Sequence, residues 1–196
     1  MKDLEFYKFI EGLKKVTRFR PFDRLHENVA GHCYSSLMLA YDIMSHYDLN
    51  LNKERVLELI LFHDIPEIGM KFDITAPECA SSNDIKAKKR EFEFAKVEDA
   101  SNKFNRPNIK ERFKEFEDKT SKEALFANFI DKLDASIHIL TNKCADFECE
   151  EDFEFILHYI DPYMVYFPEL NELVCEIKSE ITKIYENFKM EKSSVI

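Results

Sequence analysis

With 196 residues, the chain is long enough to bury a sizeable apolar core, and it fits one domain with room for at most two small ones. The net charge of −10 argues against general nucleic-acid binding, because such binding depends on Lys and Arg side chains that neutralise phosphates. Five cysteines, an odd number without a CxxC pair, argue against a disulfide framework and favour reduced thiols in a cytoplasmic protein.

Apolar residues recur at helical spacing along almost the whole chain. The predicted helices cover residues 4–16, 28–46, 53–62, 85–104, 121–140, 153–160 and 170–188. No stretch alternates as a half-buried strand does, and no apolar run is long enough to cross a membrane. We see no signal peptide after Met1. The pattern therefore predicts an all-α helical bundle, one domain over residues 1–196, with roughly seven helices.

The spacing also predicts caps and buried faces. Asn28 is expected to cap the second helix, and Ser121 the helix that it precedes. The residues expected to face inward in the third helix are Val56, Leu57, Ile60 and Leu61. Those expected to be buried in the helix 85–104 are Phe92, Ala95 and Phe104. The charged remainder of residues 84–122 is expected to face solvent.

A histidine–aspartate pair, His63 and Asp64, follows directly after an apolar run. Taken alone, such a pair is as consistent with a helix cap or a core contact as with a metal site. Two further ligand-type residues, His32 and Asp131, lie on two other predicted helices. Two imidazoles and two carboxylates, without thiolate, suit a divalent cation such as Mn, Fe, Co, Ni or Zn, and argue against a Cys-rich structural zinc site.

Three motifs in this order, "ENVAGH" (27–32), "FHDIPE" (62–67) and "IDKLDA" (130–135), resemble those of the HD-domain metal-dependent phosphohydrolases. More narrowly, they resemble the 5′-deoxynucleotidase-like branch, over residues from about 10 to 140. The resemblance implies a metal-site core within this range, on which the C-terminal helices of residues 150–190 pack. It implies one divalent metal ion (Mn, Co, Fe, Ni, Zn or Mg) held by four ligands: His32, His63, Asp64 and Asp131.

The resemblance also implies roles for residues around the metal. Glu67 matches the acid that helps to activate the attacking water, although it is also consistent with a surface acid. Arg18 or Arg20 occupies the place of a phosphate-binding arginine, although both are also consistent with a basic helix end. Asp73, matched to a residue that contacts the sugar, is equally consistent with a turn residue. Lys71 is an alternative phosphate ligand.

Two positions depart from the pattern of this branch. Gly31 stands where an acidic residue commonly precedes the first metal histidine, and with Asn28 as the N-cap it forfeits a capping box. Asp73 follows Phe72 rather than Gly and lies one residue later than usual. The second departure lies at the expected sugar contact. It therefore bears on the identity of the substrate more than on the binding of the metal.

The activity implied by the resemblance is removal of the 5′-phosphate from a nucleoside or deoxynucleoside monophosphate. The alternatives are hydrolysis of another phosphate ester, such as a nucleoside triphosphate or a phosphodiester, and a metal-binding protein without catalytic activity. The expected partner is a small phosphorylated molecule, and homodimers are frequent in this branch.

One helix offers two carboxylates for one ligand position, Asp131 and Asp134, which lie three residues apart and point to roughly the same side. The resemblance selects Asp131, because it aligns with the last ligand of the family. Asp134 is then expected either behind the ligands or at the surface. His138, seven residues after Asp131, shares its helical face but is interpreted as structural.

Overall fold

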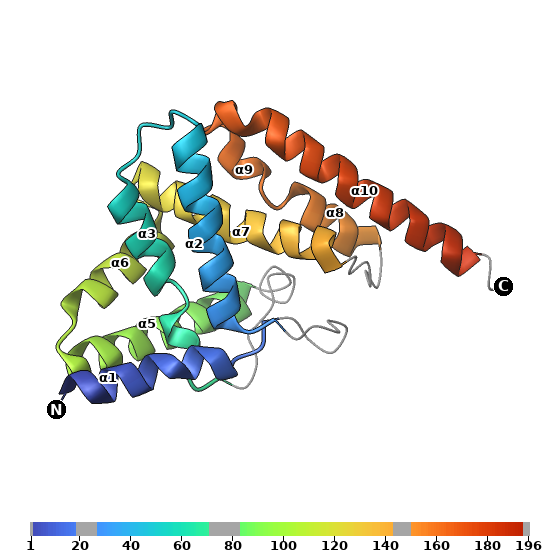
Figure 1. Cartoon of the computed structure of the whole chain (residues 1–196). Helices are drawn as coiled ribbons and strands as arrows, with labels where there is room; N and C mark the ends of the chain where they lie inside the picture. The colour runs from blue at the N-terminus through green and yellow to red at the C-terminus, as the bar shows by residue number, and fades with distance from the viewer. Residues whose placement is uncertain (1, 19–26, 71–82, 143–149, 194–196) are drawn as a thin grey trace.

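The structure of the protein, a computed structural model, describes residues 2–18, 27–70, 83–142 and 150–193 (Figure 1). These residues form α1 (Lys2–Ile10), η1 (Glu11–Lys15), α2 (Val29–His46), α3 (Lys53–Phe62), η2 (Ile65–Glu67), α5 (Asn83–Phe104), α6 (Pro107–Asp118), α7 (Lys122–Asn142), α8 (Glu150–His158), α9 (Asp161–Met164), η3 (Pro168–Leu170) and α10 (Asn171–Ser193). Within the described ranges the chain contains no strand, only an isolated bridge between Thr17 and Asn28. The all-α prediction is confirmed. None of these helices is long and apolar enough to traverse a lipid bilayer.

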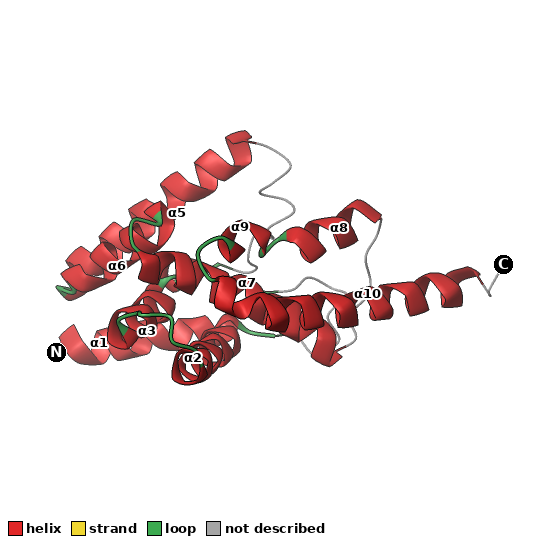
Figure 2. Ribbon diagram, turned by 90° about the horizontal axis from the view of Figure 1, so that it is seen from above, coloured by secondary structure: helices red, strands yellow, loops and turns green. Residues whose placement is uncertain are grey.

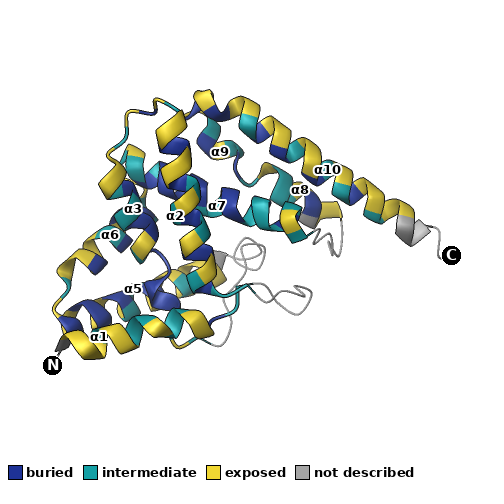
Figure 3. Ribbon diagram, viewed as in Figure 1, coloured by how far each residue is buried: buried dark blue, intermediate teal, exposed yellow. Residues whose placement is uncertain are grey.

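Helix α7 lies at the centre of the molecule and contacts α2, α3, α6, α9 and α10 (Figure 1). Seen from above, α5 and α2 lie on opposite sides of the bundle (Figure 2). Buried residues gather along α7 and on the inward sides of its neighbours (Figure 3). Phe126 and Phe129 of α7 are fully buried and both contact the ring of Phe167. The core is therefore built around one helix, on which any polar residue needs a partner.

The helix α6 was not predicted from the sequence. Most of its residues are charged, but Ile109, Phe113 and Phe116 form an apolar stripe, spaced by four and three residues. All three are buried. Pro107 starts this helix, since proline is well tolerated in the first turn. The spacing of these apolar residues was the signal that could have revealed the helix.

The predicted buried faces of two helices were wrong in part. In α3, Leu61 is 49% exposed while Leu59 is fully buried, so that the inward stripe is Val56, Leu59 and Ile60. This stripe continues at helical spacing to His63. In α5, Phe92 is 48% exposed and Ala95 is exposed, whereas Phe104 is buried as expected. A helix with scattered apolar residues offers more than one stripe, and only the packing partners decide which one is buried.

The carboxylate of Glu115 on α6, whose side chain is 8% exposed, joins α6 to α3 and to the start of α7, two of the helices that carry the candidate site. It accepts hydrogen bonds from Arg55 Nε of α3 at 2.8 Å, from Arg112 Nη1 of its own helix at 3.2 Å and from Ser121 Oγ at 2.6 Å. Ser121 caps α7 through the backbone N–H of Ala124. Burial raises the pKa of Glu115, but these hydrogen bonds and the arginine charges outweigh it and lower the pKa.

We predict that Glu115→Gln lowers the free energy of unfolding by about 1–2 kcal/mol at pH 7, because the arginine and hydroxyl donors lose a charged acceptor. A carboxyl group whose pKa is lowered on folding contributes stability above its ordinary pKa, and this contribution is lost as the pH falls. The difference from the wild type should therefore disappear as the pH falls below the ordinary value of 4.5. Denaturant unfolding at several pH values measures this.

The matched control is Glu111→Gln, an exposed position on the same helix, which should leave the stability unchanged at every pH. An equal loss for Glu115→Gln at neutral and at acid pH would contradict the assigned role, because it would come from packing and not from charge.

Candidate metal centre

The start of α2 positions His32 in the first turn of the helix. Asn28 is the N-cap as predicted, and its side chain accepts a hydrogen bond from the N–H of Gly31 at 2.8 Å. Just before it, the chain forms a short antiparallel pairing, in which the N–H of Val29 donates to Val16 at 3.0 Å and the N–H of Arg18 donates to Glu27 at 3.0 Å. These bonds hold the backbone of Arg18 beside the segment that leads into α2 and His32.

His63 and Asp64 lie where α3 ends and η2 begins. The Nδ1 atom of His63 lies 2.7 Å from the carbonyl oxygen of Ile60. Because a carbonyl can only accept, Nδ1 carries the proton, and the lone pair of Nε2 faces away from the helix. Such a carbonyl partner behind a histidine is the arrangement that orients imidazoles toward metals.

His32, which is completely buried, is also held by an acceptor behind its ring, in this case a carboxylate. Its Nδ1 atom lies 2.5 Å from Oδ2 of Asp134, and its Nε2 atom lies 3.4 Å from Nε2 of His63. The two Nε2 atoms therefore face one another across a small space. Asp134, which the sequence left open as a surface acid, is 4% exposed and belongs to the support of His32.

Both predicted carboxylate ligands border the same space. Oδ1 of Asp131 lies 3.2 Å from Nε2 of His32 and 3.7 Å from Nε2 of His63. Oδ1 of Asp64 lies 3.1 Å from Nε2 of His63. The structure thus brings together the four side chains that the sequence singled out, from α2, α7 and the end of α3.

Electrostatics at this point favour a positive charge. Burial and the charge of Arg18 lower the pKa of His32, but hydrogen bonds to Asp131 and Asp134 and the charge of Asp64 raise it to about 9. Two imidazole nitrogens and two carboxylates are also the ligands that divalent transition metals accept. The residues present fit such a cation.

Two further groups of potential ligands fit a metal less well. They are Cys33 with His63 and Asp64, and Glu27 with His32 and Asp134. Cys33 lies 3.8 Å from Oδ2 of Asp64, but burial raises the pKa of its thiol above the usual range, and the charges of Asp64 and Glu67 raise it further. Without a metal, the thiol of Cys33 is a weak donor to this carboxylate. The group of Glu27, His32 and Asp134 uses the Nδ1 side of His32, which the short bond to Asp134 already occupies.

Arg18, one of two predicted phosphate ligands, borders the metal centre. Its side chain is 14% exposed, and its terminal nitrogens donate to Oδ2 of Asp64 at 3.4 Å and to Oδ1 of Asp131 at 3.2 Å. Glu67 is 5% exposed, so its interpretation as a solvated surface acid was wrong. Arg20, Lys71 and Asp73 lie outside the described residues.

The sequence interpretation missed Lys132, which follows the ligand Asp131 on α7. Its Nζ atom lies 3.3 Å from Oδ2 of Asp131, and the side chain is 13% exposed. A lysine inside an apolar helix, beside a ligand, was the available signal. His138 lies 3.5 Å from Glu27 and does not join the four ligands, in line with its structural interpretation.

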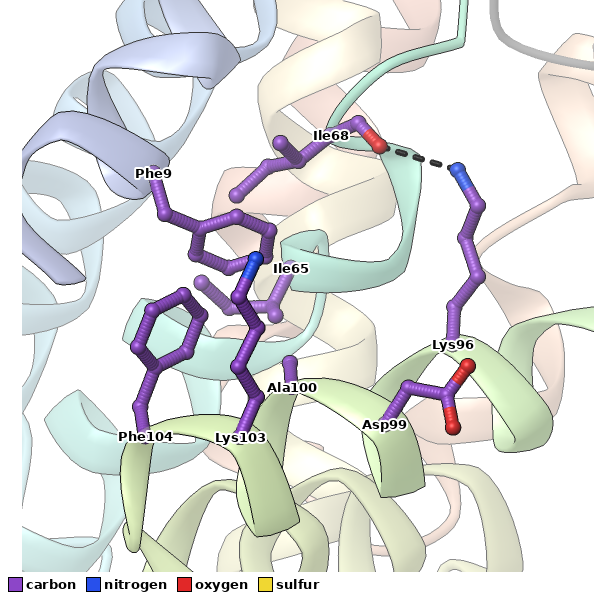
Figure 4. Close-up of a pocket in the computed structure, with 8 residues that line it drawn as sticks. All are labelled: Phe9, Ile65, Ile68, Lys96, Asp99, Ala100, Lys103 and Phe104. Carbon is purple, nitrogen blue, oxygen red and sulfur yellow. Dashed lines mark hydrogen bonds between the residues drawn. The ribbon is translucent and has the colours of Figure 1, made fainter. Parts of the chain in front are cut away.

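A cavity of about 470 Å³ lies between α1, η2 and α5 and is separate from the metal centre (Figure 4). Its lining residues are Phe9, Ile65, Ile68, Lys96, Asp99, Ala100, Lys103 and Phe104. Lys96 Nζ donates to the carbonyl of Ile68 at 2.9 Å (Figure 4). None of the four candidate ligands lines this cavity, so it is not the place of the chemistry described above.

We predict that Asp131→Ala purifies with little metal, whereas Asp134→Ala still binds metal with an affinity lower by about 10- to 100-fold, the usual effect of losing a group that supports a ligand. Calorimetric titration with Mn²⁺ or Zn²⁺ measures both. Asp99→Ala, an exposed position on α5, serves as the control and should bind as the wild type does. The reverse order of the two α7 variants would overturn the assignment of Asp131 as ligand.

Residues 10–159 match the sequence profile of a family described as HD domain. No curated protein matches the chain. Among the solved structures that share its fold are three described below. A protein from Pyrococcus horikoshii OT3 has a TM-score of 0.71 and 17% identity, covering 90% of this chain and 99% of its own. A conserved hypothetical protein from Pyrococcus furiosus has a TM-score of 0.67 and 20% identity, with the same coverage. A predicted metal-dependent phosphohydrolase from Magnetospirillum magnetotacticum MS-1 has a TM-score of 0.66 and 19% identity, covering 93% of this chain and 95% of its own.

Proposed function

Because this chain belongs to the HD domain family, we propose that it is a metal-dependent phosphohydrolase that removes the 5′-phosphate from a nucleoside or deoxynucleoside monophosphate. The observation that carries the proposal is the convergence of the Nε2 atoms of two imidazoles and of two carboxylates beside the guanidinium of Arg18. The Magnetospirillum protein, a predicted metal-dependent phosphohydrolase, supports the coarser part of this proposal.

The proposed metal ligands are His32, His63, Asp64 and Asp131. A divalent cation bound there supplies Lewis acidity, which lowers the pKa of water and polarises a phosphorus–oxygen bond. The hydrogen bonds behind the two imidazoles, to Asp134 and to the carbonyl of Ile60, keep their lone pairs directed at one point. The site is therefore organised before a ligand arrives, as catalysis by charge stabilisation requires.

Arg18 is the proposed phosphate ligand among the described residues. Its guanidinium is held beside the ligand carboxylates by the backbone pairing to Glu27, and most of it is shielded from water. A planar fork with several N–H donors suits a phosphate group, and the charge persists at any working pH. Arg18 thus binds and orients the phosphate at the edge of the metal centre.

Glu67 is the proposed base that orients or deprotonates the attacking water. It lies in η2, three residues after Asp64, and its carboxylate is buried rather than solvated. Its charge acts on Cys33, the neighbour of His32, together with the charges of Asp64 and Asp131. Glu67 therefore lies near the buried acids of the metal centre, and carboxylates serve as general bases in such sites.

The proposal predicts phosphate release from nucleoside 5′-monophosphates, abolished by a chelator and restored by a divalent metal. A screen of nucleoside mono-, di- and triphosphates and of a phosphodiester, followed by chromatography of the products, measures this. Glu67→Gln should lower kcat by about 100-fold with the metal retained. The exposed Glu91→Gln on α5 is the matched control. Hydrolysis of triphosphates or diesters alone would overturn the substrate, and a metal-loaded protein without hydrolysis of any phosphate would overturn the enzyme assignment.

Arg18 can be tested separately from the metal. We predict that Arg18→Ala raises KM for the monophosphate by roughly 10-fold or more, and that Arg18→Lys restores little, because the forked hydrogen bonds are lost. Inhibition by inorganic phosphate should weaken in parallel, while inhibition by the nucleoside without phosphate should not change. Arg106→Ala, which removes an arginine paired with the exposed Asp3, is the control. Unchanged phosphate inhibition in Arg18→Ala would show that the phosphate is held elsewhere.

A further inference from the structure

Lys132 is an unusual residue for the centre of a helical bundle. Lysine is rarely buried unless its charge is paired, yet the Lys132 side chain is only 13% exposed. It lies on α7, the most buried helix, directly after the candidate ligand Asp131. The burial of this ammonium group needs a physical reason, because its positive charge repels a cation in the neighbouring metal centre.

The surroundings of Lys132 hold its ammonium in one place. Nζ lies 3.3 Å from Oδ2 of Asp131, 5.0 Å from the ring centre of Tyr159 and 5.6 Å from that of Tyr163. Tyr159 follows α8 and Tyr163 lies in α9, which packs against α7 (Figure 1). Aromatic faces attract cations, and the attraction grows when water is excluded. The two rings therefore restrain the ammonium at the carboxylate.

The two oxygens of Asp131 consequently have different neighbours. Oδ1 faces the imidazoles, at 3.2 Å from Nε2 of His32 and 3.7 Å from Nε2 of His63, and accepts from Arg18 at 3.2 Å. Oδ2 faces the ammonium of Lys132. A carboxylate can bind a metal through one oxygen or through both. Arg18, which donates to Oδ1, is the proposed ligand of the phosphate, whereas Lys132 is held at Oδ2 by two rings, where its charge repels another cation.

We propose that Lys132 is a positioning residue that restricts Asp131 to one ligand atom, Oδ1, and that Tyr159 and Tyr163 hold Lys132 in this place. The inference rests on the metal site of the proposed function. Its consequence is that one coordination position, which a chelating carboxylate would fill, stays open for water or substrate. Catalytic metal sites differ from structural ones in this open position.

The test uses the full chain loaded with Mn²⁺ and counts exchangeable water molecules on the metal by water-proton relaxation. Lys132→Met removes the charge and keeps an unbranched apolar chain. We expect one water fewer than in the wild type, a dissociation constant for Mn²⁺ no larger than that of the wild type, and an activity lower by about 10- to 100-fold. Lys132→Arg keeps the charge and should keep the wild-type water count.

The tyrosines and a second lysine provide the controls. Tyr159→Phe keeps an aromatic face and should match the wild type, whereas Tyr159→Leu should shift the water count toward that of Lys132→Met. Lys122→Met removes another lysine of α7 that lies over a ring, 5.8 Å from the centre of Phe167, and should change neither metal nor water.

Two results would overturn the inference. One is an unchanged water count in Lys132→Met. The other is a Lys132→Met protein that no longer binds Mn²⁺, which would mean that Lys132 only stabilises the fold around the ligands. A wild-type protein that binds no Mn²⁺ is a different outcome, because it refutes the metal site of the proposed function itself and is seen before any variant is compared.

Discussion

The imidazole of His32 is held at both ring nitrogens by a single helix. Asp134 of α7 accepts from Nδ1 at 2.5 Å, and Asp131, one turn earlier, lies 3.2 Å from Nε2. Three residues of helical spacing separate the two carboxylates, so they lie on one side of α7 and can flank one ring. The orientation of His32, the direction of its lone pair and the distance between α2 and α7 all depend on this arrangement.

The same helix supplies the apolar core and the charged centre, and these demands conflict. Phe126 and Phe129 anchor α7 in the core, while buried carboxylates and an ammonium group are costly to desolvate. The conflict is resolved by giving each buried charge a partner of opposite sign or a hydrogen-bond donor. Arg18 and Lys132 neutralise Asp131 from two sides, and both shift the pKa of that carboxyl group well below its ordinary value despite burial.

The sequence predicted those features that depend on spacing along one helix. Asn28 as a cap and the helical content follow from local rules, and the gathering of His32, His63, Asp64 and Asp131 follows from a resemblance between motifs. Features that depend on packing between helices were wrong or missed. The exposed Leu61 of α3 and the buried Lys132 owe their environments to neighbours that are distant in sequence, which a single chain without aligned relatives does not reveal.

The antiparallel pairing before α2 fixes the position of Arg18 through main-chain atoms. The N–H of Arg18 donates to the carbonyl of Glu27, and the N–H of Val29 donates to the carbonyl of Val16. Neither bond uses a side-chain atom, so the separation of Arg18 from the start of α2 depends on the path of the backbone. The guanidinium can therefore stay beside the metal centre during evolution while the side chains around this pairing diverge.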